Sequence, residues 1–175
     1  QARTADEMHE ALCGLGVVLA AEATREPGWP AWLAALSKAG RATRLQPQAL
    51  WVAAERLALV QRVYPGAATE PALAALPDAG LDDAAEQPIA ALLRMRLSGL
   101  GPVSARQLCE DFAVAFSTVR AGLLAQQAEG YAMVLAENAD LDDEDRTWCE
   151  RRLLARKHRY SREARRKTAR PLPPA

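Results

Sequence analysis

Apolar residues recur at helical spacing in several short stretches, and turns rich in glycine and proline separate these stretches. Thr4 and Glu7 have the spacing of a capping box, in which two helix-start amides are satisfied reciprocally. The apolar positions that follow predict a first helix, ended by the glycines of "GLG" at 14–16. A second helix is predicted over 31–39, after the loop "REPGWP", whose prolines and glycine disfavour a helix interior.

After Gly40 the apolar positions change to the alternation typical of strands. The segments "RATRL" and "ALWVA", joined by "QPQ", predict a hairpin with Leu45, Leu50 and Val52 pointing inward. A helix over 54–63, ended by "YPG", completes a first unit of residues 1–64. Residues 65–88 contain four prolines and predict a linker, with at most one helical turn around 73–76.

Residues 89–170 repeat this plan as a second unit, which a tail of residues 171–175 follows. A helix begins at Ile89, "GLGP" ends it, and Ser104 and Ser117 are predicted to cap the next two helices. The apolar positions of the third helix, Val119, Leu123 and Leu124, are predicted to be buried, and Gly130 to end it. "YAMVLAENA" predicts a strand and a turn. A long basic helix is then expected from about residue 143, because acidic residues 142–145 favour the positive end of a helix dipole.

The two units match in sequence as well as in plan. "LCGLGVV" (12–18) aligns with "LSGLGPV" (97–103), and "LAALSKAGRATRL" (33–45) aligns with "LLAQQAEGYAMVL" (123–135), with glycine on glycine in both pairs. Three helices followed by a hairpin is the winged-helix arrangement, a variant of helix-turn-helix. The predicted fold class is therefore mainly α with short β-hairpins, built as two winged-helix units in tandem.

The zero net charge of the chain conceals a strong asymmetry. Residues 1–150 carry 12 Lys+Arg against 21 Asp+Glu, whereas residues 151–175 carry 10 against 1. A basic segment of this kind binds a polyanion, or it pairs with an acidic surface of the same protein.

The basic segment has a narrow apolar stripe if it is helical throughout. Cys149, Leu153, Tyr160 and Ala164 form this stripe, and Trp148 and Leu154 widen it at one end. The remaining faces carry the candidate nucleic-acid contacts Arg151, Arg152, Arg156, Lys157, Arg159, Arg162, Arg165 and Arg166. Contacts of these residues with phosphates would make binding strongly dependent on salt. The alternative is a solvated helix whose arginines pair with acidic residues elsewhere.

Weaker candidates for DNA contact lie outside the basic segment. Thr118 and Arg120 belong to the third helix of the second unit, which would be its recognition helix. Arg41 and Arg44 flank the first hairpin and could touch a phosphate backbone, and Trp51 could stack on a base. In the first unit the equivalent helix is "PAWLAALSK" (30–38), which offers almost no polar position except Lys38, so we expect this unit to be a structural spacer.

Signatures of catalysis, metal binding and cofactor binding are not found in the sequence. The chain has no phosphate-binding glycine loop, and its two histidines, His9 and His158, form no HxxxH or HExxH motif. Its three cysteines are far apart and are predicted to be buried thiols. The acidic run 140–145 fits neither an EF-hand nor a paired-carboxylate site. We therefore expect no catalytic residue, no metal site and no cofactor.

No apolar run is long enough to cross a bilayer, and the N-terminus does not resemble a signal peptide. These features and the unpaired cysteines favour a cytoplasmic location. Because the first residue is Gln1 rather than methionine, we expect a domain of a longer protein.

Three stretches resemble the large helicase-related (Lhr) family of bacterial superfamily 2 ATP-dependent DNA helicases. They are "LWVAAERLALVQRVYPGA" (50–67), "GLGPVSARQLCEDF" (99–112) and "WCERRLLARKHRYSREARR" (148–166), and "ARTADEMHEALCGLG" fits the same region. The resemblance implies a DNA-repair helicase whose ATP-driven motor consists of two RecA-like domains absent from this chain. It implies that this chain is an accessory region beyond the motor, where winged-helix modules help to hold single-stranded DNA.

This chain departs from the family at Lys157, Ser161 and Arg162, where the family usually has isoleucine, threonine and leucine. These differences put in doubt how tightly the end of the basic segment packs. A uracil-DNA glycosylase activity is implied for some members, but no carboxylate here can be placed on that active site. The main alternative function is a protein-interaction module, whose basic helix docks on an acidic face of the helicase domains. An independent, dimeric transcription regulator ranks last, because the sequence has no dimerisation heptads.

Overall fold

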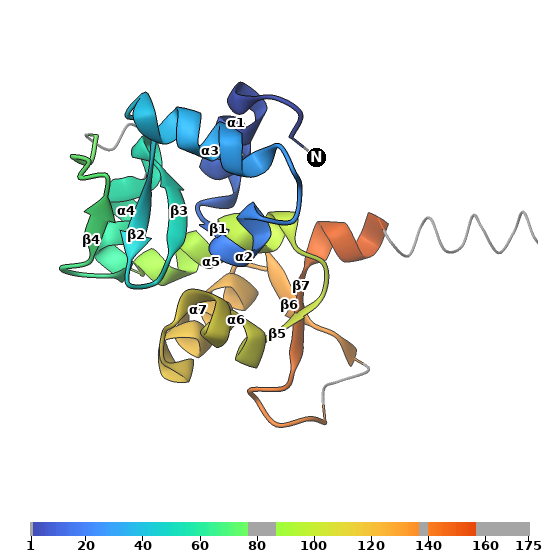
Figure 1. Cartoon of the computed structure of the whole chain (residues 1–175). Helices are drawn as coiled ribbons and strands as arrows, with labels where there is room; N and C mark the ends of the chain where they lie inside the picture. Colours follow the sequence, from blue (N-terminus) through green and yellow to red (C-terminus); the bar gives the residue numbers. More distant parts are fainter. Residues whose placement is uncertain (1, 77–86, 137–139, 157–175) are drawn as a thin grey trace, which may run out of the picture.

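The computed structural model describes residues 2–76, 87–136 and 140–156. This part of the chain is a mixture of helices and two antiparallel sheets, in agreement with the predicted mixture of helices and short hairpins (Figure 1). The first sheet has the strand order β1-β3-β2-β4, and the second has the order β5-β7-β6.

Residues 5–70 contain the helices and strands of the first half. These are α1 (Ala5–Leu15), β1 (Val18–Leu19), α2 (Ala20–Ala23), α3 (Trp29–Lys38), β2 (Ala42–Gln46), β3 (Leu50–Ala53), the 3-10 helix η1 (Ala54–Arg56), α4 (Leu57–Val63) and β4 (Ala68–Glu70). Thr4 caps α1 by accepting a hydrogen bond from the Glu7 amide at 3.2 Å. The predicted box is only half formed, because the Glu7 carboxylate accepts from the amide of Arg3 instead.

The predicted hairpin is confirmed in its position and its inward residues. β2 pairs with β3, with Leu45 opposite Leu50, and Leu45, Leu50 and Val52 are all buried. The prediction of a linker from residue 65 is wrong at β4, which pairs with the free edge of β2. The expected helical turn around 73–76 is also not observed. Residues 68–70 form a strand because short loops bring them to the free edge of β2, which offers unpaired backbone groups.

Residues 88–150 contain the second half. Its elements are α5 (Pro88–Gly99), β5 (Val103–Ser104), α6 (Ala105–Phe112), α7 (Phe116–Ala128), β6 (Ala132–Val134) and β7 (Thr147–Glu150). Ser104 caps α6, as predicted, by accepting from the Gln107 amide at 3.1 Å. Ser117 is not the cap of α7, because the helix begins at Phe116 and its N-cap is Ala115, two residues before Ser117. Leu124 was expected to be buried and is 41% exposed.

The two halves repeat one order of elements. Each has helix, strand, helix, helix, strand, strand, in α1-β1-α2-α3-β2-β3 and again in α5-β5-α6-α7-β6-β7. In each half the first strand of this order pairs antiparallel with its last strand, β1 with β3 and β5 with β7. Val18 lies opposite Trp51, and Val103 lies opposite Trp148, so the repeat extends to the strand register.

The acidic run predicted that a long basic helix begins near residue 143, but no helix begins there. Residues 147–150 form β7, the central strand of the second sheet, and the chain becomes helical only at 151–156. Trp148 and Cys149 are therefore buried strand residues and do not belong to a helical stripe. Pairing with strands on both sides satisfies the backbone of 147–150 and outweighs the local preference for a helix start.

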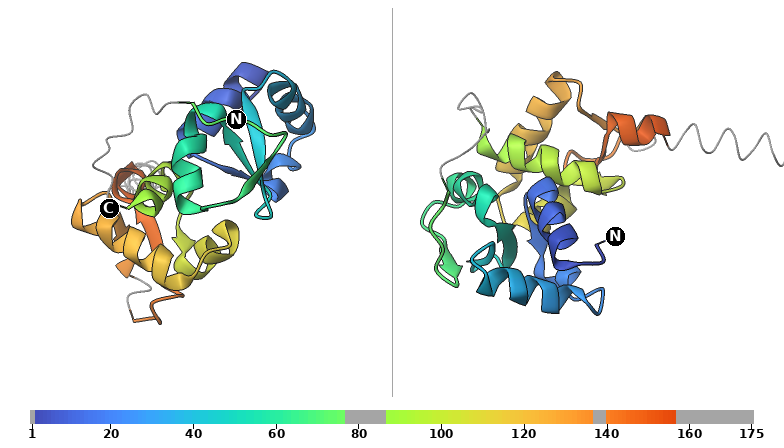
Figure 2. Two further views of the ribbon diagram at one scale, coloured as in Figure 1. Left: turned by 90° about the vertical axis from the view of Figure 1, so that its left-hand side faces the viewer. Right: turned by 90° about the horizontal axis from the view of Figure 1, so that it is seen from above.

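Helix α5 joins the two halves into one body. It lies between α4 and α7 and also contacts α1, and both turned views show it between the halves (Figure 2). One hydrophobic core contains Val52 and Tyr64 of the first half together with Leu93, Phe112 and Trp148 of the second. A smaller core under α1 and α3 belongs to the first half alone.

Two buried polar contacts cross between the halves within this core. The Tyr64 hydroxyl donates to the backbone carbonyl of Phe112 at 2.7 Å. The Arg96 guanidinium of α5, 2% exposed, forms an ion pair with the Glu22 carboxylate of α2. The two halves are thus packed together through shared apolar and polar contacts.

Candidate nucleic-acid interface

The basic segment leaves the second sheet directly. The Arg151 amide donates to the Tyr131 carbonyl at 2.9 Å, which extends the pairing between the β6 and β7 regions by one bond. Residues 151–156 are helical, with Leu153 and Leu154 half-buried and the arginines exposed. Figure 1 shows this helix projecting from the side of the molecule. The sheet therefore fixes where the basic segment begins, while its charged side chains face solvent.

Arg151, Arg152 and Arg156 have no ion-pair partner among the described residues, which distinguishes them from most arginines of the second half. Arg94 pairs with Glu129, Arg106 with Glu144 and Asp145, and Arg120 and Arg146 share Asp143. An exposed arginine that lacks a carboxylate can neutralise a phosphate without first breaking an internal pair. The start of the basic segment is therefore the most available cationic surface of the second half.

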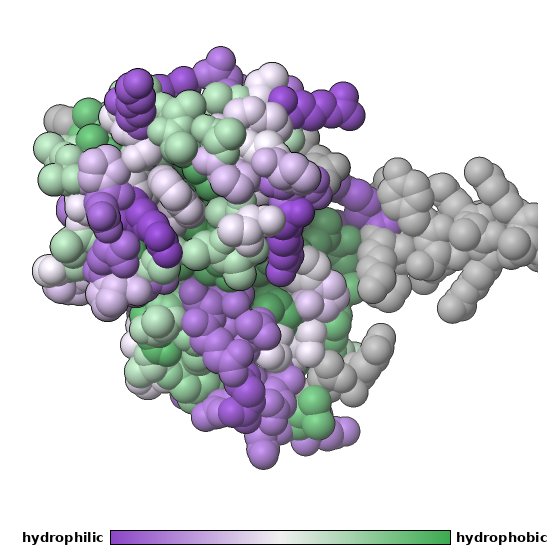
Figure 3. Space-filling view, in the orientation of Figure 1, coloured by the Kyte–Doolittle hydropathy of each residue, from purple (hydrophilic) through white to green (hydrophobic). Residues whose placement is uncertain are grey.

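The acidic turn before β7, residues 142–145, has a role that differs from the predicted helix start. Arg106 of α6 binds the Asp145 carboxylate through two nitrogens at 2.8 and 3.4 Å and reaches Glu144 at 3.0 Å. The Arg106 hydrogen bond holds the pKa of the Asp145 carboxyl below its usual range. The space-filling view shows hydrophilic side chains gathered over α6 and this turn (Figure 3). Both signs of charge are present there, but α6 and residues 142–145 carry one arginine against six carboxylates, so the patch is net acidic even when Arg120 and Arg146 are added.

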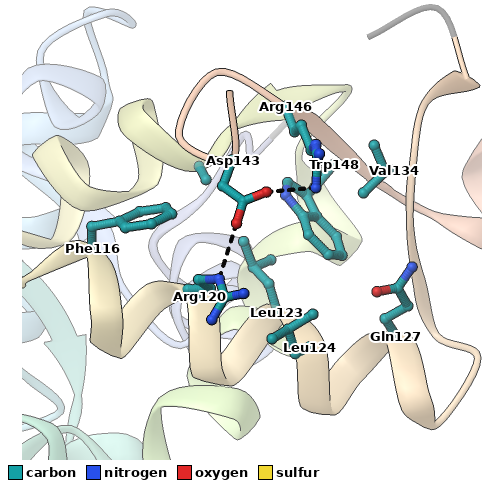
Figure 4. A pocket seen from close by; sticks show the side chains of 10 residues that line it. Phe116, Arg120, Leu123, Leu124, Gln127, Val134, Asp143, Arg146 and Trp148 are labelled. Atoms are coloured by element: carbon teal, nitrogen blue, oxygen red, sulfur yellow. Dashed lines mark hydrogen bonds and ion pairs between the residues drawn. The ribbon is translucent and has the colours of Figure 1, made fainter. Parts of the chain in front are cut away.

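Asp143 of the same turn lies between two arginines. Its carboxylate accepts a hydrogen bond from Arg120 Nε at 3.2 Å and forms an ion pair with Arg146 Nη1 at 2.5 Å. Figure 4 shows Asp143 between the Arg120 side chain of α7 and the Arg146 side chain, which comes from the residue before β7. Arg120, a predicted DNA contact, is therefore exposed but already paired, and a phosphate would have to compete with Asp143 for it.

A pocket of about 160 Å³ lies between α7 and the β6–β7 region. The side chains of Leu123, Leu124, Val134 and Trp148 give it apolar walls, and the Asp143 bridge closes one side (Figure 4). The Trp148 indole nitrogen is buried, and none of the described residues accepts its hydrogen bond. The volume suits no more than a single small ring.

Thr118 and the first-half candidates are less available than the sequence suggested. Thr118 lies half-buried in the first turn of α7. Arg41 is engaged, because it binds Asp6 at 2.7 Å and the His9 ring at 2.9 Å. Arg44 and Trp51 lie half-buried in the middle of the first sheet, on strands that are paired on both sides. Trp51 packs partly against the smaller core, so only part of its ring could stack on a base.

Five of the predicted contacts, Lys157, Arg159, Arg162, Arg165 and Arg166, lie outside the described residues. Of the others, Arg151, Arg152 and Arg156 form one cluster, and Arg44 lies opposite Trp51 in the register of β2 and β3. Sequence reasoning missed the neutralisation of Arg106, Arg120 and Arg146 by the turn at 142–145. The signal was the acidic run itself, since four acidic residues in a row can serve arginines that are distant in the sequence.

No family model matches the chain, and no match is found among the curated proteins. Within residues 2–76, 87–136 and 140–156, no helix has both the length and the apolar character needed to span a bilayer.

Proposed function

We propose that this chain is a non-catalytic accessory DNA-binding region of an Lhr-type ATP-dependent DNA helicase, built from two winged-helix units. The single observation that carries DNA binding is the cluster of Arg151, Arg152 and Arg156, which is exposed and lacks carboxylate partners among the described residues. These arginines lead into a segment that holds most of the remaining basic residues of the chain. Such a cluster binds phosphates irrespective of base sequence.

The repeated order of elements supports the winged-helix assignment. In each half the repeated order contains three helices, with a short strand after the first helix and a hairpin after the third, and the short strand pairs with the far strand of the hairpin. In winged-helix proteins the third helix reads the major groove. Here the corresponding helix α7 has Arg120 neutralised by Asp143. The proposal therefore places backbone binding on the basic segment and gives the helices of both units a supporting role.

The test is a titration of labelled single-stranded and duplex DNA at several salt concentrations. The variant Arg151→Ala/Arg152→Ala removes two proposed phosphate contacts. It should lower the slope of log affinity against log salt by about 1.4 to 1.8 and weaken binding at every salt concentration. The matched control Arg3→Ala/Arg25→Ala removes the same charge from two exposed arginines of the first half. It should leave the slope close to that of the unmodified chain.

Two results would contradict DNA binding by this segment. The first is no binding at low salt, and the second is an equal loss in both double variants, which would indicate only non-specific attraction. Absence of binding would favour the second candidate, a protein-interaction module whose basic segment docks on an acidic face of the motor domains. The net acidic patch over α6 and residues 142–145 favours that candidate, because its carboxylates pair with the nearby arginines and leave little free positive charge beside the basic segment.

Asp143→Asn provides an independent check on the role of α7. If phosphates can reach Arg120 once the bridge is removed, this variant should bind DNA several-fold more tightly at low salt. The control Asp142→Asn makes the same change in charge at an exposed neighbour with no ion pair among the described residues. Equal gains in both variants would show that α7 has no part in binding.

A further inference from the structure

Three potential metal-ligating side chains meet at the edge of the smaller core. His9 and Cys13 lie four residues apart on α1 and so share one face of the helix. Glu55 comes from η1, directly after the first hairpin. His9 Nε2 lies 3.1 Å from Glu55 Oε2, and Cys13 Sγ lies 3.9 Å from His9 Nε2 and 3.8 Å from Glu55 Oε2. The same three atoms take part in all three contacts, so one ion could reach all of them.

These separations fit tetrahedral coordination. Zinc binds thiolate sulfur at about 2.3 Å, imidazole nitrogen at about 2.05 Å and carboxylate oxygen at about 2.05 Å, so the tetrahedral angle places nitrogen and oxygen about 3.4 Å apart and sulfur about 3.6 Å from each. The observed separations of 3.1, 3.9 and 3.8 Å differ from these by a few tenths of an ångström. Only small movements of the side chains are needed to bring all three donors to a single ion.

The site is reachable from solvent. The His9 side chain is 12% exposed, whereas the Glu55 side chain is 47% exposed and leaves one side open. Burial, with Glu55 as a second contribution, raises the pKa of the Cys13 thiol, so the thiol is protonated until a metal displaces its proton. Burial alone would raise the pKa of the Glu55 carboxyl, yet a backbone hydrogen bond and His9 together lower it. The carboxylate is therefore available as an anionic ligand.

Arg41 acts against metal binding. Its Nη2 lies 2.9 Å from His9 Nδ1, and because an arginine can only donate, Nδ1 must accept this hydrogen bond. The neutral His9 ring therefore carries its proton on Nε2, which donates to Glu55. A metal on Nε2 requires that proton to move to Nδ1, and Arg41 must then turn away. The Asp6 carboxylate, 2.7 Å from Arg41, can retain it. Arg56 is occupied with the Cys13 carbonyl, so Arg41 is the cation that opposes the ion most directly.

We propose that His9, Cys13 and Glu55 form a zinc-binding site that links α1 to the end of the first hairpin, with a fourth position open to water or another ligand and an affinity limited by Arg41. From the sequence we expected no metal site, although the HxxxC spacing of His9 and Cys13 was a signal for two of the ligands. This proposal does not depend on DNA binding.

The test uses Co²⁺ as a spectroscopic probe under reducing, oxygen-free conditions. The protein should bind one equivalent of Co²⁺ with a thiolate-to-cobalt charge-transfer band, and Zn²⁺ should displace it. Cys13→Ser should abolish the band, and Glu55→Gln, at an exposed position, should weaken binding at least about tenfold. Arg41→Gln should strengthen binding about tenfold, because it removes a cation that opposes the metal. The matched control Cys109→Ser removes another partly buried thiol and should leave the band unchanged.

The proposal is overturned if no band appears at saturating Co²⁺, if Cys13→Ser retains the band, or if Cys109→Ser removes it. If Cys13→Ser does not fold, Glu55→Gln and Arg41→Gln decide the matter. Unchanged affinity in both of these variants would also overturn the site.

Discussion

Replacing Glu22 with glutamine removes the negative charge that neutralises Arg96 at the contact between the two halves. Arg96 is 2% exposed and Glu22 is 15% exposed. Arg96 Nη1 has a marginal second contact with the Val17 carbonyl at 3.5 Å, and its Nε has no hydrogen-bond partner among the described residues. The guanidinium therefore depends on Glu22 for most of its compensation, and an uncompensated buried charge is costly.

The expected cost of Glu22→Gln is about 3 kcal/mol, the lower end of the range for a broken buried pair, because Glu22 lies near the surface. The glutamine carbonyl oxygen can still accept the Leu19 amide hydrogen bond, which Glu22 Oε2 now accepts at 3.0 Å. Its NH2 group then faces Arg96 in place of Oε1, so the change removes both the negative charge and the acceptor of the Arg96 hydrogen bond. Arg96→Met should cost only about 1 kcal/mol, since it also removes the unsatisfied Nε. The double variant should lie within about 1 kcal/mol of the original chain, because it leaves no buried charge.

The assay is urea unfolding of the two single variants and the double variant, followed by circular dichroism and analysed as a double-mutant cycle. Glu22→Gln should also lower the Tm by about 6 to 12 °C, at about 2 to 4 °C per kcal/mol for a chain of this size. Glu129→Gln is the matched control, since its partner Arg94 is half exposed, and it should cost less than about 1 kcal/mol. The reasoning is refuted if Glu22→Gln costs no more than this control, or if the two single costs simply add.

The remaining predictions concern Tyr64 and Gly122, which contact the core shared by the two halves, and Gly14 on α1. Tyr64→Phe should destabilise the chain by about 1 to 2 kcal/mol, because it leaves the buried Phe112 carbonyl without its donor. Burial raises the pKa of the Tyr64 phenol. The contribution of this phenol to the stability of the fold is therefore complete below its usual pKa near 10 and is lost as the pH rises above that value. In that alkaline range the Tyr64→Phe variant should lose less stability than the original chain does. Gly122→Ala should destabilise by about 1 to 3 kcal/mol, because a Cβ there would lie 2.7 Å from an α5 side chain. Gly14→Ala, with no atom within 4 Å of its added Cβ, should instead stabilise α1 by about 0.5 to 1 kcal/mol, and equal effects of the two alanines in thermal unfolding would contradict this packing.

Local signals in the sequence predicted many of the elements well. The Thr4 and Ser104 caps and the alternation around residues 42–53 depend on contacts between residues that are close in the chain, so a short window contains the information. The dependence on local contacts also explains why the prediction of a helix from residue 143 was wrong. The acidic run favours a helix start locally, but β5 and β6 bind the segment as a strand, and those strands lie outside any local window.

The candidate interface was likewise predicted only in part from the sequence. The charge composition predicted a basic surface from residue 151 onward, and exposed arginines are found at its start. The sequence did not predict that Arg41 and Arg120 are already paired, since their partners lie 35 and 23 residues away. Glu55 lies 46 residues from His9 in the sequence, so the third potential metal ligand could not be predicted from local spacing.

By itself, the sequence determined the helix caps, the hairpin, the repeated glycine pattern and the division of the chain into acidic and basic parts. Each of these follows from backbone preferences or from composition, which do not require distant residues. Only the tertiary structure decided that α5 lies in a core shared by both halves, that Trp148 belongs to a central strand, and which arginines remain available to a phosphate. The reason is that burial and ion pairing depend on which surfaces come into contact after folding, and those contacts join residues that are far apart in the chain.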